Sequence, residues 1–85
     1  MYIINIRQKN LLESLYFNLY VLKYKNLDNI DKKQIDNNIK FLFEELDTEK
    51  TSYKIQNIVM SLVEDKNNNN RYFINLLNEN NIIIQ

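Results

Sequence analysis

The stretch from Leu11 to Tyr24 reads LLESLYFNLYVLKY, and it decides the fold. When its residues are placed about 100° apart, as in an α-helix, the apolar ones fall into two stripes on opposite sides. The first stripe consists of leucines, namely Leu11, Leu12, Leu15, Leu19 and Leu22. The second is mainly aromatic and consists of Phe17, Tyr20, Val21 and Tyr24. A helix that is apolar on nearly all sides is either buried or shared between two surfaces. The sequence therefore predicts a central helix over about residues 7–25.

A second helical pattern begins at Asp31. Asp is a good N-cap, and Gln34 three residues later completes a capping box. Ile30 and Ile35 stand in the positions of a hydrophobic staple. One apolar stripe follows, formed by Ile35, Ile39, Leu42, Phe43 and Leu46. We expect a helix with a single buried face, from which Phe41 points away.

Two shorter helices are expected in the second half of the chain. The third begins at Thr51 or Ser52, and its apolar stripe ends before the four asparagines at 67–70. The fourth covers about residues 71–80, with Asn70 as its predicted cap. Residues 2–6 and 82–84 are rich in isoleucine, so they are either extended segments that pair as strands or helix ends.

These patterns predict an all-α fold, a small bundle of three to four helices with short terminal segments, formed by one domain over residues 1–85. The residues at the centres of their stripes are expected to form the core. They are Leu15, Leu19, Ile39, Leu42, Ile58 and Leu62.

The composition is strongly biased. Asn, Ile, Lys and Tyr supply 16, 12, 9 and 6 of the 85 residues, whereas Gly and Pro are absent. The abundant residues have AT-rich codons, which indicates an AT-rich genome such as that of some bacteria and their phages or plasmids. The net charge is zero, but residues 1–40 carry a basic excess and residues 41–85 an acidic one. A dipolar molecule of this kind is not expected to bind nucleic acid strongly.

The chain lacks most of the residue types that enzymes use for catalysis. The absence of His and Cys removes the commonest acid–base group, the thiol nucleophile and the usual transition-metal ligands. The absence of Gly removes the phosphate-binding loops and the turn of the EF-hand. We therefore expect no enzyme activity, no cofactor and no metal. No apolar run is long enough to span a membrane, and the N-terminus does not resemble a signal peptide, so a cytoplasmic location is expected.

Two groups of residues are candidates for binding a partner. The aromatic stripe of Phe17, Tyr20, Val21 and Tyr24 is either packed inside the bundle or exposed to another chain. Tyr is enriched at interfaces because it buries a large area while its hydroxyl stays hydrated. The second group is an acidic cluster, either a solvated face or a site for a basic partner, formed by Glu44, Glu45, Asp47 and Glu49.

The function that fits best is that of a small inhibitor, immunity or accessory protein. Such a protein acts stoichiometrically on a macromolecule, with a second protein chain as partner and self-association into a homo-oligomer expected. The alternative is a small nucleic-acid-binding regulator of helix-turn-helix type, formed by the second and third helices. That motif lacks its usual turn Gly here, and only Lys54 supplies a basic group near the start of its recognition helix.

Overall fold

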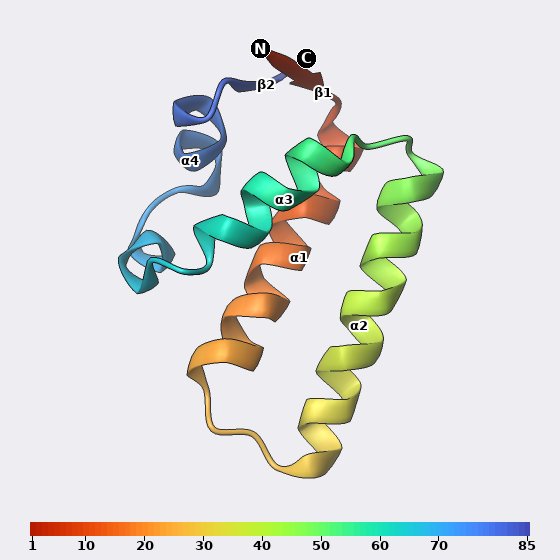
Figure 1. Cartoon of the computed structure of the whole chain (residues 1–85), viewed down its shortest axis with the longest axis vertical. Coiled ribbons are helices and arrows are strands. Elements are labelled where there is room, and N and C mark those ends of the chain that lie inside the picture. The colour runs from red at the N-terminus through yellow and green to blue at the C-terminus, as the bar shows by residue number, and fades with distance from the viewer.

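The computed structural model of the protein describes all 85 residues as four α-helices, one short 3₁₀ helix and two three-residue strands (Figure 1). In chain order these are β1 (Tyr2–Ile4), α1 (Ile6–Tyr24), α2 (Asn29–Thr48), α3 (Tyr53–Leu62), η1 (Lys66–Asn70), α4 (Phe73–Glu79) and β2 (Ile82–Ile84). The predicted all-α fold, a small bundle with short terminal segments, is confirmed.

Helix α1 is the centre of the molecule. It contacts α2, α3 and η1, so it packs against other elements on more than one side. In Figure 1, α2 returns beside α1, α3 crosses α1, and α4 lies on the opposite side from α2. The nearly continuous apolar surface of α1 follows from this central position.

The first two helices begin at side-chain caps. The Asn5 side chain accepts a hydrogen bond from the Gln8 N–H at 2.7 Å, and the Gln8 side chain accepts one from the Asn5 N–H at 2.9 Å. This is the capping box of α1. The capping box predicted at Asp31 is wrong, because the N-cap of α2 lies three residues earlier, at Asp28. The Asp28 carboxylate accepts a hydrogen bond from the Asp31 N–H at 2.8 Å, which places Asp31 in the first turn.

The staple predicted for α2 is also absent, since Ile30 is 81% exposed. At its other end α2 closes with a Schellman motif, in which the Thr51 N–H donates to the Leu46 carbonyl at 2.9 Å. Lys50 occupies the left-handed position of this motif, with φ 57°, where Gly is usual. Of the two caps predicted for α3, Thr51 and Ser52, the structure shows Ser52, whose side chain accepts a hydrogen bond from the Lys54 N–H.

The asparagine run forms the 3₁₀ helix η1 rather than an open loop. Asp65 caps η1 by accepting a hydrogen bond from the Asn67 N–H at 3.0 Å. The prediction that Asn70 caps the fourth helix is wrong, because Asn70 ends η1 and α4 begins at Phe73. Its N-cap, Tyr72, makes no side-chain capping bond.

The two ends of the chain meet as a parallel pair of strands, β1 with β2, in the register Tyr2 to Ile82, Ile3 to Ile83 and Ile4 to Ile84. Of the two possibilities open for these segments, the structure shows strands. Ile4 and Ile82 are buried and join the hydrophobic core, so this small sheet closes one end of the bundle.

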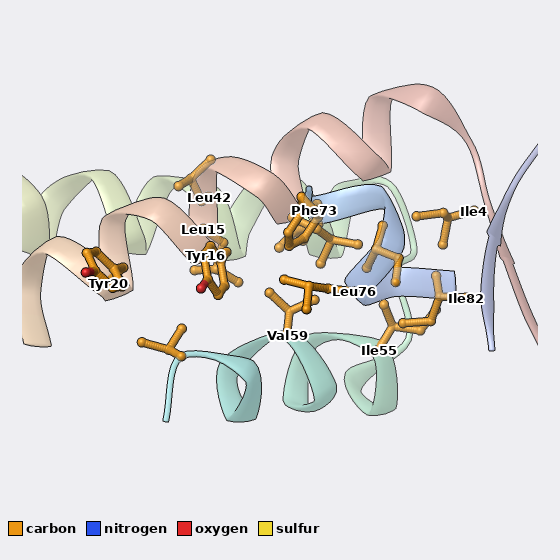
Figure 2. Packing of buried hydrophobic residues seen from close by; sticks show 14 residues of the cluster. Ile4, Leu15, Tyr16, Tyr20, Leu42, Ile55, Val59, Phe73, Leu76 and Ile82 are labelled. Atoms are coloured by element: carbon orange, nitrogen blue, oxygen red, sulfur yellow. The ribbon is translucent and has the colours of Figure 1, made fainter. Parts of the chain in front are cut away.

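The core draws on all four α-helices and on both strands, and Figure 2 shows many of its side chains meeting between α1, α3 and α4. Among the predicted core residues, Leu15 and Leu42 are buried. The other four pack against the core and stay partly exposed, namely Leu19, Ile39, Ile58 and Leu62. Six residues have 0% exposure, namely Leu12, Leu15, Leu46, Val59, Leu77 and Ile82, and only Leu15 among them is a predicted core residue.

Candidate protein-binding surface

The structure divides the aromatic stripe of α1 between the core and the surface. Tyr20 is only 7% exposed and belongs to the core, so for this residue the structure shows the packed one of the two possibilities. Tyr24 is half-buried, and the Tyr20 and Tyr24 ring centroids lie 4.9 Å apart. Val21 is half-buried, whereas Phe17 is 59% exposed. Only the Phe17 and Val21 side of the stripe faces solvent.

The chain that leaves α3 contacts Tyr24. The Tyr24 hydroxyl donates to the Val63 carbonyl at 2.7 Å, and the Glu64 carbonyl lies 3.1 Å from the same hydroxyl. The last carbonyls of a helix have no partner within the helix, so Tyr24 acts as a C-terminal cap for α3. The Lys66 ammonium lies 5.6 Å from the centre of the Tyr24 ring, which adds a cation–π contact.

Tyr16 lies one turn before Tyr20 on α1 and is buried in the core. Its ring centroid lies 5.6 Å from that of Phe73 (Figure 2). Its hydroxyl is buried and has no hydrogen-bond partner. Burial raises the pKa of this phenol, and repulsion from Asp65 and from the ionised forms of Tyr20 and Tyr24 raises it further. Tyr16 is therefore a neutral core residue.

Three of the four carboxylates in the acidic cluster at the end of α2 have side-chain partners within the molecule. Glu45 and Glu49 both pair with Arg7 of α1, at 3.2 and 3.4 Å. Asp47 accepts a hydrogen bond from the Gln56 side chain at 3.3 Å. Glu44 alone among the four has no ion-pair or side-chain hydrogen-bond partner, and it is exposed. The structure thus leaves one free carboxylate where the sequence suggested a cluster.

A different exposed surface crosses the seam between α1 and α2. The side-chain amide of Asn38 on α2 donates to that of Asn18 on α1 at 3.3 Å, and this bond marks the seam. Asn18 also donates to the Ser14 carbonyl, one turn earlier on α1. The residues beside this seam form a surface that we call the α1–α2 face, namely Ser14, Phe17, Asn18, Val21, Asn38 and Phe41.

Two phenylalanines stand on the α1–α2 face. Phe17 is adjacent to Asn18 and lies three residues after Ser14, so it belongs to the outer side of α1. Phe41 lies three residues after Asn38 and four before Glu45, which are the residues of α2 that bond to α1. Their exposed fractions are 59% and 57%. No residue of this face is charged, and Glu44 borders it one turn beyond Phe41.

The molecule also has a shallow groove of about 270 Å³ between α1 and α3. Its floor is apolar, and Lys23 and Glu64 form an ion pair at its rim. This pairing raises the pKa of Lys23. The volume lies just below the range of about 300–1,000 Å³ that is typical of ligand sites.

Comparison with known proteins gives no relative, since no protein-family model, curated protein or solved structure matches the chain. The carboxylates do not gather into any group able to hold a metal ion. None of the helices combines the length and hydrophobicity that crossing a lipid bilayer requires.

The sequence alone indicated part of the α1–α2 face. Phe17 and Val21 were candidates there, and Phe41 was recognised as lying off its stripe. The Asn18–Asn38 bond across the seam was not foreseen, because an asparagine carries no helical-face signal in a chain with 16 of them. Without that bond, nothing places Phe17 and Phe41 on one surface.

Proposed function

We propose that this protein is a small non-catalytic binding protein, of the inhibitor, immunity or accessory type, that acts stoichiometrically on another protein through the α1–α2 face. The observation that carries the proposal is the pair Phe17 and Phe41, both more than half exposed on one uncharged surface. Phe is among the residues most often buried, and exposed apolar patches with polar rims mark interaction sites.

The composition of the α1–α2 face suits a protein partner. A few aromatic anchors supply most of the binding energy at protein interfaces, and the polar residues around them exclude water. Here the anchors are Phe17 and Phe41, and amide or hydroxyl side chains surround them. Charged residues are depleted at interface centres, as they are here. Glu44 at the border offers one contact for a basic group of the partner. The AT-rich codon bias fits a source in a phage, a plasmid or another mobile element.

The experiment is a pull-down from the native host with matched variants. Phe17→Ala/Phe41→Ala should lose the partner that the wild-type protein captures, while far-UV circular dichroism stays unchanged. Tyr53→Ala/Tyr72→Ala is the control, since these side chains are 71% and 80% exposed but lie on other elements. Equal capture by both double variants would reject the α1–α2 face as the binding surface.

A nucleic-acid-binding regulator is the weaker alternative. The exposed residues of α3 include only one cation, Lys54, and Glu64 and Asp65 follow the helix directly. A recognition helix needs basic or amide side chains directed at bases and phosphates. The surface of α3 therefore favours the protein-binding function.

A further inference from the structure

The small sheet formed by β1 and β2 has one face packed on the core and the other face exposed to solvent. Ile3 and Ile83 are register partners and are 53% and 37% exposed, whereas their neighbours Ile4 and Ile82 are buried. Met1 precedes Ile3 by two residues and is 86% exposed, so it extends the same side. Parallel strands occur almost only in sheets with both faces covered. The sheet at this end of the molecule, where both termini lie (Figure 1), therefore lacks a neighbour.

The strand β1 also has an open edge. The Tyr2 N–H donates to the Asn81 carbonyl at 2.7 Å, and the Ile4 carbonyl accepts from the Gln85 N–H at 2.9 Å. Tyr2 and Ile4 thus direct their backbone groups to β2. Because successive residues of a strand direct these groups to opposite sides, the N–H and C=O of Ile3 point away from β2. Neither group has a hydrogen-bond partner in the molecule.

Nothing in β1 protects this edge. Natural edge strands are blocked by charged side chains, by Pro or by bulges. Residues 1–6 read MYIINI, with no charged side chain and no Pro. The strand is regular through its three residues, and a two-stranded sheet is at best marginally stable alone. The free edge of β1 can therefore pair with an additional strand.

We propose that a second copy of this chain supplies that strand, by antiparallel pairing of β1 with β1 about a two-fold axis at Ile3. The symmetry places the two Ile3 residues opposite one another, so the N–H of each donates to the C=O of the other. One residue with one free donor and one free acceptor is its own complement. The result is a four-stranded sheet with Ile83, Ile3 and their two copies in one row on the outer face.

This pairing is independent of the α1–α2 face. It brings no like charges together, because the side chains of residues 1–6 are uncharged and the antiparallel order places the two Met1 ammonium groups at opposite ends of the pair. The edge is short, so the interface belongs to the small, weakly associating class. The dimer should therefore form reversibly and depend on protein concentration.

The test is sedimentation velocity of the full chain over a wide concentration range, with two variants of Ile3. Ile3→Pro removes the N–H that the proposed dimer uses, yet Pro is tolerated in an edge strand where that N–H faces solvent. Ile3→Val keeps the N–H and the β-branched shape. We expect wild type and Ile3→Val to dimerise, and Ile3→Pro to stay monomeric with an unchanged circular dichroism spectrum.

Three results would overturn the proposal. These are a wild-type protein that stays monomeric throughout, an Ile3→Pro variant that dimerises like wild type, and an Ile3→Val variant that loses dimerisation as fully as Ile3→Pro. If Ile3→Pro fails to fold, amide hydrogen exchange of the wild type decides. Protection of the Ile3 amide that grows with protein concentration supports the pairing, and exchange independent of concentration refutes it.

Discussion

Tyr16 carries the only buried side-chain polar atom that lacks a hydrogen-bond partner. A buried unpaired hydroxyl costs about 1–3 kcal/mol of stability. Tyr16→Phe removes that hydroxyl and keeps the ring that packs against Phe73. We expect the variant to be more stable than wild type by about 1 kcal/mol or more in urea unfolding.

Tyr24→Phe is the matched control, because the Tyr24 hydroxyl does have a partner, the Val63 carbonyl. Its removal should lower the free energy of unfolding by about 0.5–1.5 kcal/mol. The two Tyr→Phe changes are thus expected to have opposite signs. A stability change of the same sign in both would contradict the hydrogen-bond assignment of one of them.

The raised pKa of Tyr16 also predicts a dependence on alkaline pH. Above the ordinary pKa of 10.0, the unfolded chain releases the phenol proton while the folded chain retains it. The free energy of unfolding therefore falls as the pH rises from about 10 towards the folded-state pKa. Tyr16→Phe lacks this loss. The difference in free energy of unfolding between Tyr16→Phe and wild type should therefore be larger at about pH 10.5 than at about pH 8. An advantage that stays constant would show that Tyr16 ionises equally in both states.

Lys50 is a second residue whose local geometry has an energetic consequence. Its φ of 57° lies in the left-handed region, which is unfavourable for a residue with a Cβ atom by about 1–2 kcal/mol. Lys50→Gly should raise the free energy of unfolding by up to about 1 kcal/mol, because Gly adopts this conformation without that cost. Lys50→Ala retains the Cβ and should give no gain. Equal melting temperatures for the Gly and Ala variants would argue against the left-handed conformation.

At the scale of the elements, the predicted and observed starts of α2 differ. The segment from Asp28 to Asp31 contains three residues of good capping type, Asp28, Asn29 and Asp31, and the apolar stripe begins only at Ile35. The sequence pattern favoured Asp31, but the backbone continues as a helix back to Asn29. Ile30 then points to solvent instead of forming a staple. Periodicity identifies a helix where it buries a face, and it cannot locate the end of a helix that extends beyond the core.

The two aspartates differ in what their replacement should do. Asp28→Ala removes the carboxylate that accepts the Asp31 N–H, and it should cost about 0.5–2 kcal/mol. Asp31→Ala removes only a favourable charge in the first turn, worth about 0.3–1 kcal/mol. Thermal unfolding of both variants gives the comparison. A larger loss from Asp31→Ala would restore Asp31 as the cap.

The double stripe of α1 shows which contacts a sequence cannot predict. Its leucine side and its Tyr16 and Tyr20 side are both packed, as a central helix requires. Tyr20 packs against Tyr24, and Tyr24 contacts Val63, Glu64 and Lys66 in the chain after α3, which has no apolar periodicity and leads into the asparagine run. Sequence patterns therefore left core and surface open for this stripe, and they could not separate buried Tyr20 from exposed Phe17.

At the scale of the whole molecule, the basic first half and the acidic second half of the sequence form ion pairs with each other. Arg7 in the basic half pairs with Glu45 and Glu49 in the acidic half, and Lys23 pairs with Glu64. These long-range pairs join α1 to α2 and to the end of α3. Each is partly exposed and contributes little stability alone, but together they leave few cations of α1 free to bind an anionic partner.

This internal pairing predicts weak and non-specific binding to duplex DNA. The net charge is zero, so the protein lacks the basic surface that releases counterions from DNA. In gel-shift and fluorescence-anisotropy titrations at physiological salt, we expect a Kd of about 10⁻⁴ M or weaker, without sequence preference. Glu45→Gln/Glu49→Gln is an informative variant, because it frees Arg7 and should strengthen this binding only slightly, with a steeper dependence on salt. A submicromolar wild-type complex would contradict the prediction and favour the helix-turn-helix regulator.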